Sequence, residues 1–306
     1  MQSVVSEPLV VPSPSQRSGW HGQLDLVFES RSAQTVLTHA QHHGPLRVQR
    51  PFREPNGGCQ VYVLNPPGGL VGGDDLCIDA RLAQGARALL TNPGATKFYR
   101  SAGAAATQRQ VFTLAAGSHL EWLPQETIVY DGARAEQATR VELTRGASFF
   151  GWEVTCLGRP ASGDLFPRGS LRQNWDLVLD GKLIWSERTR IEADAPIRHA
   201  LWGLASRPVF ATLIAYPVNE AGLEAARSAL TEAPASAETP EQPAVESSTV
   251  SQSSAWLGAT LLGDALICRY LGFKSREALA TFTRVWSSLR PTHFGCLAVP
   301  PRIWAT

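Results

Sequence analysis

The sequence predicts a mostly β protein of stacked β-strands, with two helices in its C-terminal third. Over residues 19–191, short segments alternate apolar with polar residues and are separated by Ser, Gly and Asn turns, which is typical of half-buried strands. Within this region one motif recurs at steps of about 30 residues, as stacked β-units would produce. After Pro217, two segments have the composition and spacing of helices.

The chain begins with a segment that has no structural period. Residues 1–18 are rich in Ser, Pro and Val, so we expect a disordered tail there. Strands are expected from residue 19 onward, where "HGQLDLVFES", "QTVLTHAQ" and "GPLRVQRPF" follow one another. We therefore predict a single, mostly β domain over residues 19–306.

The recurring motif consists of Leu, two small or polar residues, Gly, a small residue and then an apolar strand. It occurs as "LAQGARALLT", "LAAGSHLEWL" and "LTRGASFFGW", with its glycines at Gly85, Gly117 and Gly146. A glycine that accepts a positive φ fits a tight turn from one strand into the next. Because Leu-x-x-Gly is also a common hairpin turn in all-β proteins, the motif favours stacked units without requiring them.

The C-terminal third contains the two predicted helices, "NEAGLEAARSAL" and residues 275–290, the second of which is stopped by Pro291. Between them, residues from about 231 to 255 are almost free of large apolar side chains and are predicted to be a disordered insertion. The second helix has an apolar stripe that faces either the core or a partner: Leu279, Phe282, Val285, Trp286 and Leu289. The final "PRIWAT" is apolar enough either to dock on a partner or to pack on its own domain.

The composition excludes several classes of partner. With 28 Lys plus Arg against 27 Asp plus Glu, the formal net charge is +1, so we expect no nucleic acid and no membrane as partner. No apolar run reaches the ~18 residues that span a bilayer, and the N-terminus lacks the basic region of a signal peptide, which favours the cytoplasm. The five cysteines never form a CxxC pair, so neither a disulfide framework nor a zinc site is predicted.

The sequence has no signature of an enzyme active site, since the spacings GxxxxGK[ST], GxSxG and HExxH are all absent. Two carboxylates stand out instead because the strands around them are aromatic and aliphatic: Glu153 in "FFGWEVTCLG" and Glu187 in "LIWSERTRI". A carboxylate in such a strand pairs with an arginine, lines a wet cavity or faces solvent. Several carboxylates close together without a catalytic base are typical of sites that contact divalent cations.

Four motifs in order resemble the UreD urease accessory protein family, called UreH in some systems: "NPPGGLVGGDDL", "TNPGATKFYRS", "LEWLPQETIVYDGA" and "GWEVTCLGRPASG". The resemblance covers residues 19–191 and, more loosely, the C-terminal region. It implies a β-helical fold and a non-enzymatic maturation factor that helps to load nickel into urease. It also implies three partners, namely the urease apoprotein, UreF and, through UreF, the GTPase UreG.

The resemblance further implies an internal water-filled tunnel that nickel crosses without a tightly bound cofactor. A metal in transit needs oxygen ligands that bind weakly and exchange fast. On this basis we predict tunnel-lining roles for Asp74, Thr96, Glu153 and Glu187, with Glu126 and Asp131 as second choices, whereas Asp75 is predicted to cap the local turn. For contact with UreF we predict the apolar side chains of the last helix and tail: Val285, Trp286, Leu289, Ile303 and Trp304.

Two other classes of function are weighed beside this one. A cytoplasmic β-solenoid that binds a polyanion or carbohydrate would need its arginines on one face, and in the sequence they are spread from Arg31 to Arg302. A metal-dependent hydrolase built on Asp74, Asp75 and Asp79 would need a further His or Glu ligand at fixed spacing and a nucleophile, for which the sequence shows no pattern.

Overall fold

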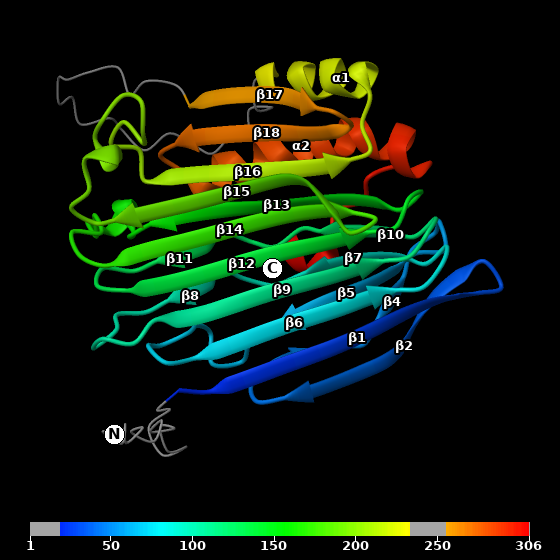
Figure 1. The fold of residues 1–306 in the computed structure, drawn as a ribbon, viewed down its shortest axis with the longest axis horizontal. Coiled ribbons are helices and arrows are strands. Elements are labelled where there is room, and N and C mark those ends of the chain that lie inside the picture. The colour runs from blue at the N-terminus through cyan, green and yellow to red at the C-terminus, as the bar shows by residue number, and fades with distance from the viewer. Residues whose placement is uncertain (1–18, 233–254, 306) are drawn as a thin grey trace, which may run out of the picture.

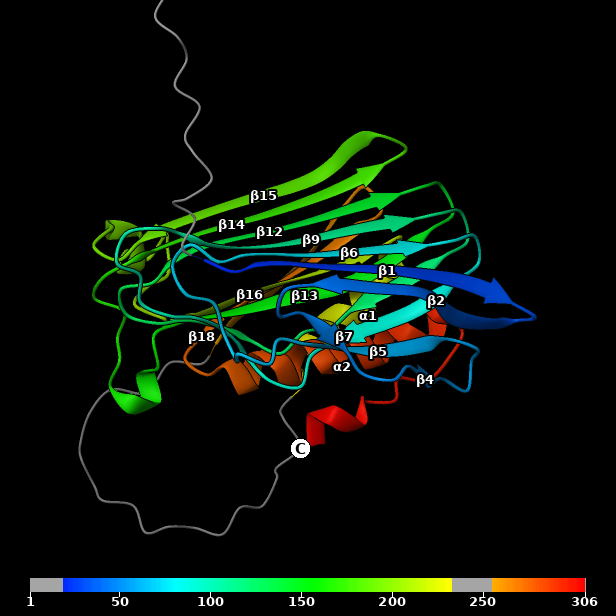
Figure 2. The ribbon, with the colours of Figure 1, turned by 90° about the horizontal axis from the view of Figure 1, so that it is seen from below.

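A computed structural model describes residues 19–232 and 255–305, and two β-sheets form the body of this part of the chain (Figure 1). The first sheet has seven strands in the order β15-β14-β12-β9-β6-β1-β2, and the second has eleven. Figure 2 shows the two sheets as separate layers, with helix α2 under the eleven-stranded one. The large core cluster contains buried side chains from both sheets, so it lies between the layers.

The seven-stranded sheet contains β1 (His21–Arg31), β2 (Gln34–His43), β6 (Asp75–Leu82), β9 (Ala106–Leu114), β12 (Arg134–Leu143), β14 (Ser170–Leu179) and β15 (Lys182–Glu192). The path of the eleven-stranded sheet follows β3 (Arg47–Val48), β5 (Cys59–Leu64), β7 (Arg87–Thr91), β10 (His119–Trp122), β13 (Ser148–Leu157), β16 (Val209–Tyr216), β18 (Ala265–Gly272) and β17 (Trp256–Leu262). Three short strands pair beside this path: β4 (Phe52–Arg53), β8 (Thr96–Phe98) and β11 (Thr127–Val129).

The central strands form the predicted β-helix. The chain passes from β6 to β7 and β8, then from β9 to β10 and β11, then from β12 to β13, and equivalent strands of successive coils pair in parallel. The predicted repeat is confirmed, because Leu114 lies opposite both Leu82 and Leu143 in the parallel register. Gly85, Gly117 and Gly146 turn each coil with φ of +71°, +70° and +87°.

Antiparallel strands complete both sheets. Hairpins add β2 and β15 to the two edges of the seven-stranded sheet, and β16, β18 and β17 extend the eleven-stranded sheet beyond β13. The β14–β15 hairpin turns at Asp180-Gly181, where both residues have positive φ, as a two-residue Asp-Gly turn requires. The three strands after residue 191 were not predicted.

Both predicted helices are confirmed, as α1 (Glu220–Thr231) and α2 (Ser275–Phe294). Asn219 caps α1 by accepting a hydrogen bond from the Gly222 amide at 3.0 Å. The prediction that Pro291 stops α2 is wrong: the helix continues to Phe294 and ends at Gly295, which adopts φ of +64°. Short 3-10 turns occur at η2 (Pro160–Ser162), η3 (Pro196–Arg198) and η4 (Arg302–Ala305).

The apolar stripe of α2 faces the core of this chain. The side chains of Val285, Trp286 and Leu289 are fully buried in the cluster between the helices and the eleven-stranded sheet. Their prediction as contacts for UreF is therefore wrong for this arrangement, since an amphipathic helix first covers the apolar face of its own sheet.

The C-terminal tail also packs on its own chain. The indole nitrogen of Trp304 donates to the Thr91 hydroxyl at 2.9 Å, and its ring lies 6.0 Å from the rings of both Trp152 and Trp286. Ile303 is half-buried in the same turn, and its predicted contact with UreF stays a prediction.

The two segments predicted to be disordered, residues 1–18 and about 231–255, fall mostly outside the described residues, which resume at Ala255. Within the described ranges, no helix is both long enough and apolar enough to cross a bilayer.

Candidate functional site

Polar side chains line the interior of the β-helix in register from coil to coil. Gln108, Gln137 and Gln173 occupy equivalent inward positions on β9, β12 and β14. The amide of Gln173 donates to Gln137 at 3.0 Å, and that of Gln137 to Gln108 at 3.5 Å. Stacked coils repeat one side-chain position many times, so a single polar position becomes a continuous ladder.

A second polar row lies beside this ladder and ends at Glu153. The Thr139 hydroxyl is within hydrogen-bond distance of both the Gln110 amide oxygen, at 3.0 Å, and Glu153 Oε1, at 2.5 Å. On the other carboxylate oxygen, Glu153 accepts a hydrogen bond from the Trp175 indole nitrogen at 2.8 Å. Glu153 is thus held by side chains that come from the opposite sheet.

The strand that carries Glu153 is buried on both faces. Phe149 of β13 lies in the core between the sheets, whereas Phe150, Trp152 and Val154 pack toward the helices. A strand covered on both sides has a nearly continuous apolar sequence, which explains why Glu153 stands among aromatic residues. This position leaves Glu153 only 3% exposed.

Burial determines the protonation of Glu153. Loss of hydration, together with a smaller contribution from the nearby Glu187 charge, raises the pKa of its carboxyl group from 4.5 to about 8, although the hydrogen bonds from Thr139 and Trp175 act in the opposite direction. At neutral pH the group therefore keeps its proton most of the time, and it becomes an anionic ligand when a cation displaces that proton.

A cavity of roughly 180 Å³ lies next to Glu153. Its polar lining includes Asn65, Thr96, Gln108, Gln110, Gln137 and Glu153. Two further donors on its wall, Gln110 Nε2 and Trp122 Nε1, are buried and have no hydrogen-bond partner among the described residues. Such a polar lining is suited to several water molecules or to a hydrated ion.

On the far side of Glu153, a row of polar side chains leads to the surface. Thr212 of β16 lies directly opposite Glu153, and Arg269 of β18 lies opposite Thr212. Glu187 reaches them from β15 of the other sheet: it accepts from the Thr212 hydroxyl at 3.2 Å and forms an ion pair with Arg269. We call Glu153, Thr212, Glu187 and Arg269 the polar file.

The polar file ends at a groove of about 340 Å³ on the surface. Thr212 and Arg269 line this groove together with the apolar side chains of Leu204, Trp256 and Leu257. The chain therefore has a polar interior that begins at the cavity and reaches the surface at Arg269.

The structure brings together three of the four predicted tunnel residues. Thr96 and Glu153 line the same cavity, and Glu187 is close enough to Glu153 to affect its pKa. Asp74 lies elsewhere: its carboxylate accepts hydrogen bonds from the backbone amides of Trp20 and Val71, at 2.8 and 2.9 Å. Asp74 is thus the turn cap that we predicted Asp75 to be.

The two second choices do not line the cavity. Glu126 accepts a hydrogen bond at 3.3 Å from Ser275, at the start of α2. Asp131 is held by Arg100 and Arg168 in ion pairs that lower the pKa of its carboxyl group, the hydrogen bond from Arg168 being the main cause. Both carboxylates hold loops in place.

The alternative functions find little support in the geometry. The three aspartates of the hydrolase hypothesis are separately engaged, since Asp75 pairs with Arg109 and Asp79 with Arg81 while Asp74 caps a turn. On the seven-stranded sheet, arginines also pair with carboxylates, namely Arg140 with Glu142, Arg172 with Glu136, Arg188 with Asp176 and Arg190 with Glu192. These pairs neutralise the positive charge that a polyanion would need.

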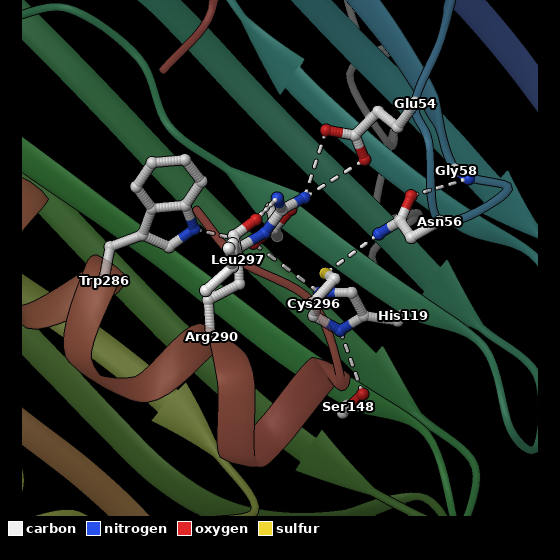
Figure 3. Close-up of polar contacts among 10 residues, drawn as sticks. Glu54, Asn56, Gly58, His119, Ser148, Trp286, Arg290, Cys296 and Leu297 are labelled. Atoms are coloured by element: carbon white, nitrogen blue, oxygen red, sulfur yellow. Dashed lines mark hydrogen bonds and ion pairs between the residues drawn. The ribbon is translucent and has the colours of Figure 1, made fainter. Parts of the chain in front are cut away.

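A second buried polar cluster was missed by the sequence reading. Arg290 of α2 makes an ion pair with Glu54 at 3.1 Å (Figure 3). It makes another with Glu121 of β10 at 2.8 Å. Trp286 donates to the same Glu121 at 2.6 Å. The sequence separation of 169 residues between Arg290 and Glu121 left no local signal for this contact.

The polar rows of the interior did have a signal in the sequence. The pairs Gln108–Gln137 and Gln110–Thr139 are each separated by 29 residues, which is also the step between the repeat glycines Gly117 and Gly146. Polar residues that recur at the coil spacing within apolar strands predict an internal ladder.

The usual metal ligands do not cluster in the part of the chain that the structure describes. Among residues 19–232 and 255–305, no three His, Cys, Asp or Glu side chains lie together in an arrangement that could hold a metal ion. The oxygen atoms of the polar file are instead distributed over three strands of the two sheets.

Comparison with known proteins agrees with the family resemblance of the sequence motifs. The family described as UreD urease accessory protein matches residues 21–305. The chain is 41% identical over 299 residues to the urease accessory protein UreD of Alkalilimnicola ehrlichii, covering 96% of each chain. It is 43% identical over 289 residues to that of Pseudomonas putida, covering 94% of this chain and 95% of the relative. The chain belongs to the UreD urease accessory protein family.

Proposed function

We propose that this chain acts in urease maturation as a conduit and scaffold: it bridges the urease apoprotein and the accessory proteins UreF and UreG, and it conducts nickel toward the urease active site. The observation that carries the proposal is the polar interior, which runs from the cavity at Thr96 through Glu153 to Glu187 and Arg269. The nickel ion is cargo in this role, and the chain catalyses no reaction of its own.

The ligand chemistry of the polar file supports transit of nickel. The carboxylate and hydroxyl oxygens of the file, like the amide oxygens of the cavity, bind a borderline cation such as Ni²⁺ more weakly than thiolates or imidazoles do, so the ion can leave each position. Glu153 also makes cation binding depend on pH, because a cation that binds there must displace the proton that burial holds on the carboxyl group. Passage through the file is therefore expected to slow as the pH falls.

For contact with UreF, we propose the exposed part of the C-terminal segment. Leu297 and Val299 follow α2 and have exposed fractions of 76% and 58%, in contrast to the buried face of the helix. Exposed apolar side chains next to one another are typical of protein contacts. Leu297→Asp together with Val299→Asp is expected to abolish co-purification with UreF, and unchanged co-purification would rule this surface out.

The compartment follows from the same role. All five cysteines are free, as in proteins of a reducing compartment, which supports the cytoplasm as the place of action.

The direct test is co-expression of the urease subunits, UreF and UreG with and without this chain, followed by measurement of the nickel content of purified urease. The proposal predicts nickel-poor, inactive urease without the chain and nickel-loaded urease with it. Equal nickel loading in both cases would overturn it.

A further inference from the structure

We propose that Arg269 closes the outer end of the polar file, acting as a tethered cation that occupies Glu187 until a metal ion replaces it. This inference rests on the proposed function, since it assigns a gate to the same passage. The residue was not singled out by the sequence reading.

The contacts of Arg269 place its charge at the end of the passage. Its guanidinium pairs with Glu187 and donates to the Thr212 hydroxyl at 2.8 Å, and Thr212 lies directly opposite Glu153 on the neighbouring strand. A cation that moves from Glu153 toward the groove must therefore pass the guanidinium.

The electrostatics of this arrangement favour a closed state. A guanidinium keeps its charge at every pH of interest, so it competes with any other cation for the Glu187 carboxylate and repels cations from the neighbouring oxygens. A fixed arginine charge in a narrow passage is a known way for proteins to exclude cations. The inner carboxyl of Glu153 is thereby shielded from ions that arrive through the groove.

The same side chain is able to move away. Arg269 is 49% exposed, whereas the Glu187 side chain is only 15% exposed. The guanidinium can swing into the surface groove that it already lines while the carboxylate stays in place. A reversible block of this kind fits a passage that opens only for its cargo.

A matched pair of variants separates this role from that of an ordinary ion pair. Arg269→Met removes the charge and keeps most of the apolar stem. Arg188→Met is the control, because Arg188 forms a comparable half-exposed ion pair with Asp176 and lies on β15 next to Glu187. Purified full-length chains are dialysed against NiCl₂, and bound nickel is measured at each free concentration, with circular dichroism as the check on folding.

The expected result is an additional bound Ni²⁺ in Arg269→Met relative to the wild type and to Arg188→Met, and loss of that ion in the double variant Arg269→Met, Glu187→Gln. Arg269→Lys keeps a charge and is expected to bind no additional ion. Arg269→Gln serves as a second uncharged variant should methionine not be tolerated. Folded uncharged variants that take up no more nickel than Arg188→Met would overturn the inference.

A second assay, nickel loading of urease, distinguishes failure of the gate from failure of the proposed function. Glu153→Gln and Glu187→Gln are tested separately for nickel loading of urease. If both load urease like the wild type, conduction through the file is wrong, whereas the nickel uptake of Arg269→Met still decides whether Arg269 blocks Glu187.

Discussion

Two buried polar regions of this chain use carboxylates in opposite ways. At the contact between α2 and β10, Glu121 receives three hydrogen bonds of 2.6 to 2.8 Å from Trp286 and Arg290, and both ion-paired side chains are almost fully buried. In the polar file, Glu153 pairs with no arginine of the described ranges and faces a cavity whose wall contains two donors without a described partner, Gln110 Nε2 and Trp122 Nε1. In the first region, side chains of this chain supply the hydrogen bonds of the carboxylate. In the second, the cavity leaves room for water or an ion beside the carboxyl group.

The protonation of the two glutamates shows the same contrast. Burial disfavours the charged form of Glu121, yet His119 and Arg290 together hold its pKa below the usual value. Burial raises the pKa of Glu153 to about 8, because hydrogen bonds from neutral groups offset it only partly. A paired charge fixes the structure, and an unpaired carboxyl group can exchange its proton for a cation.

The largest effect on stability is expected from disrupting the ion pairs of Arg290 between α2 and β10. Arg290→Met leaves Glu54 and Glu121 without their shared cation in a buried site, which typically costs about 3–5 kcal/mol in the free energy of unfolding. Urea denaturation of the purified chain measures it. Arg188→Met removes a half-exposed ion pair and is expected to cost only about 0–1 kcal/mol. Similar costs for the two variants would show that the Arg290 cluster does not stabilise the fold.

The pH dependence of stability tests the raised pKa that distinguishes Glu153 from Glu121. The unfolded chain releases this proton near pH 4.5 and the folded chain near pH 8, so the folded state binds more protons between these values. The free energy of unfolding of the wild type is therefore expected to fall, relative to Glu153→Gln, as the pH rises from about 4.5 to about 8.

Thermal unfolding measured across this pH range tests the prediction. Glu142→Gln, which removes an exposed glutamate from the outer face of β12, is the control and is expected to follow the wild-type curve. Parallel curves for the wild type and Glu153→Gln would contradict a raised pKa.

A smaller effect is expected at Asp74, which belongs to neither region. Asp74→Ala leaves the backbone amides of Trp20 and Val71 without their acceptor, and a buried unsatisfied donor costs about 1–3 kcal/mol. Urea denaturation should show this loss, whereas urease activation per folded chain should stay normal. Loss of urease activation by an Asp74→Ala variant of normal stability would contradict this prediction and would indicate that Asp74 lines the nickel passage.

The sequence predicted the features that repeat or that break a local pattern. The Leu-x-x-Gly motif led to stacked β-units because each coil repeats one turn, and the family resemblance identified these units as a β-helix. Glu153 was found because a carboxylate in an apolar strand is conspicuous. The apolar stripe of α2 was found too. A periodic stripe has the same sequence whether it faces a core or a partner, so its assignment to UreF was wrong for Val285, Trp286 and Leu289.

The grouping of side chains into the polar file depends on contacts that only the folded chain creates. Glu187, Thr212 and Arg269 come from three strands in two different sheets, and their meeting follows from how the sheets stack. The choice between Asp74 and Asp75 depended on a single step along the strand: Asp75 begins β6 and faces Arg109, whereas Asp74 remains in the turn. Such one-residue differences lie within the error of predicted strand boundaries.

The most direct test of the central claim is the nickel content of urease matured with variants of the polar file. Glu153→Gln and Glu187→Gln are each co-expressed with urease, UreF and UreG, and Asp131→Asn, which alters a carboxylate outside the cavity, is the control. We predict nickel-poor urease with the first two variants, normal nickel with the control, and intact complexes in all three cases. Full nickel loading by both Glu153→Gln and Glu187→Gln would contradict conduction through the interior of this chain.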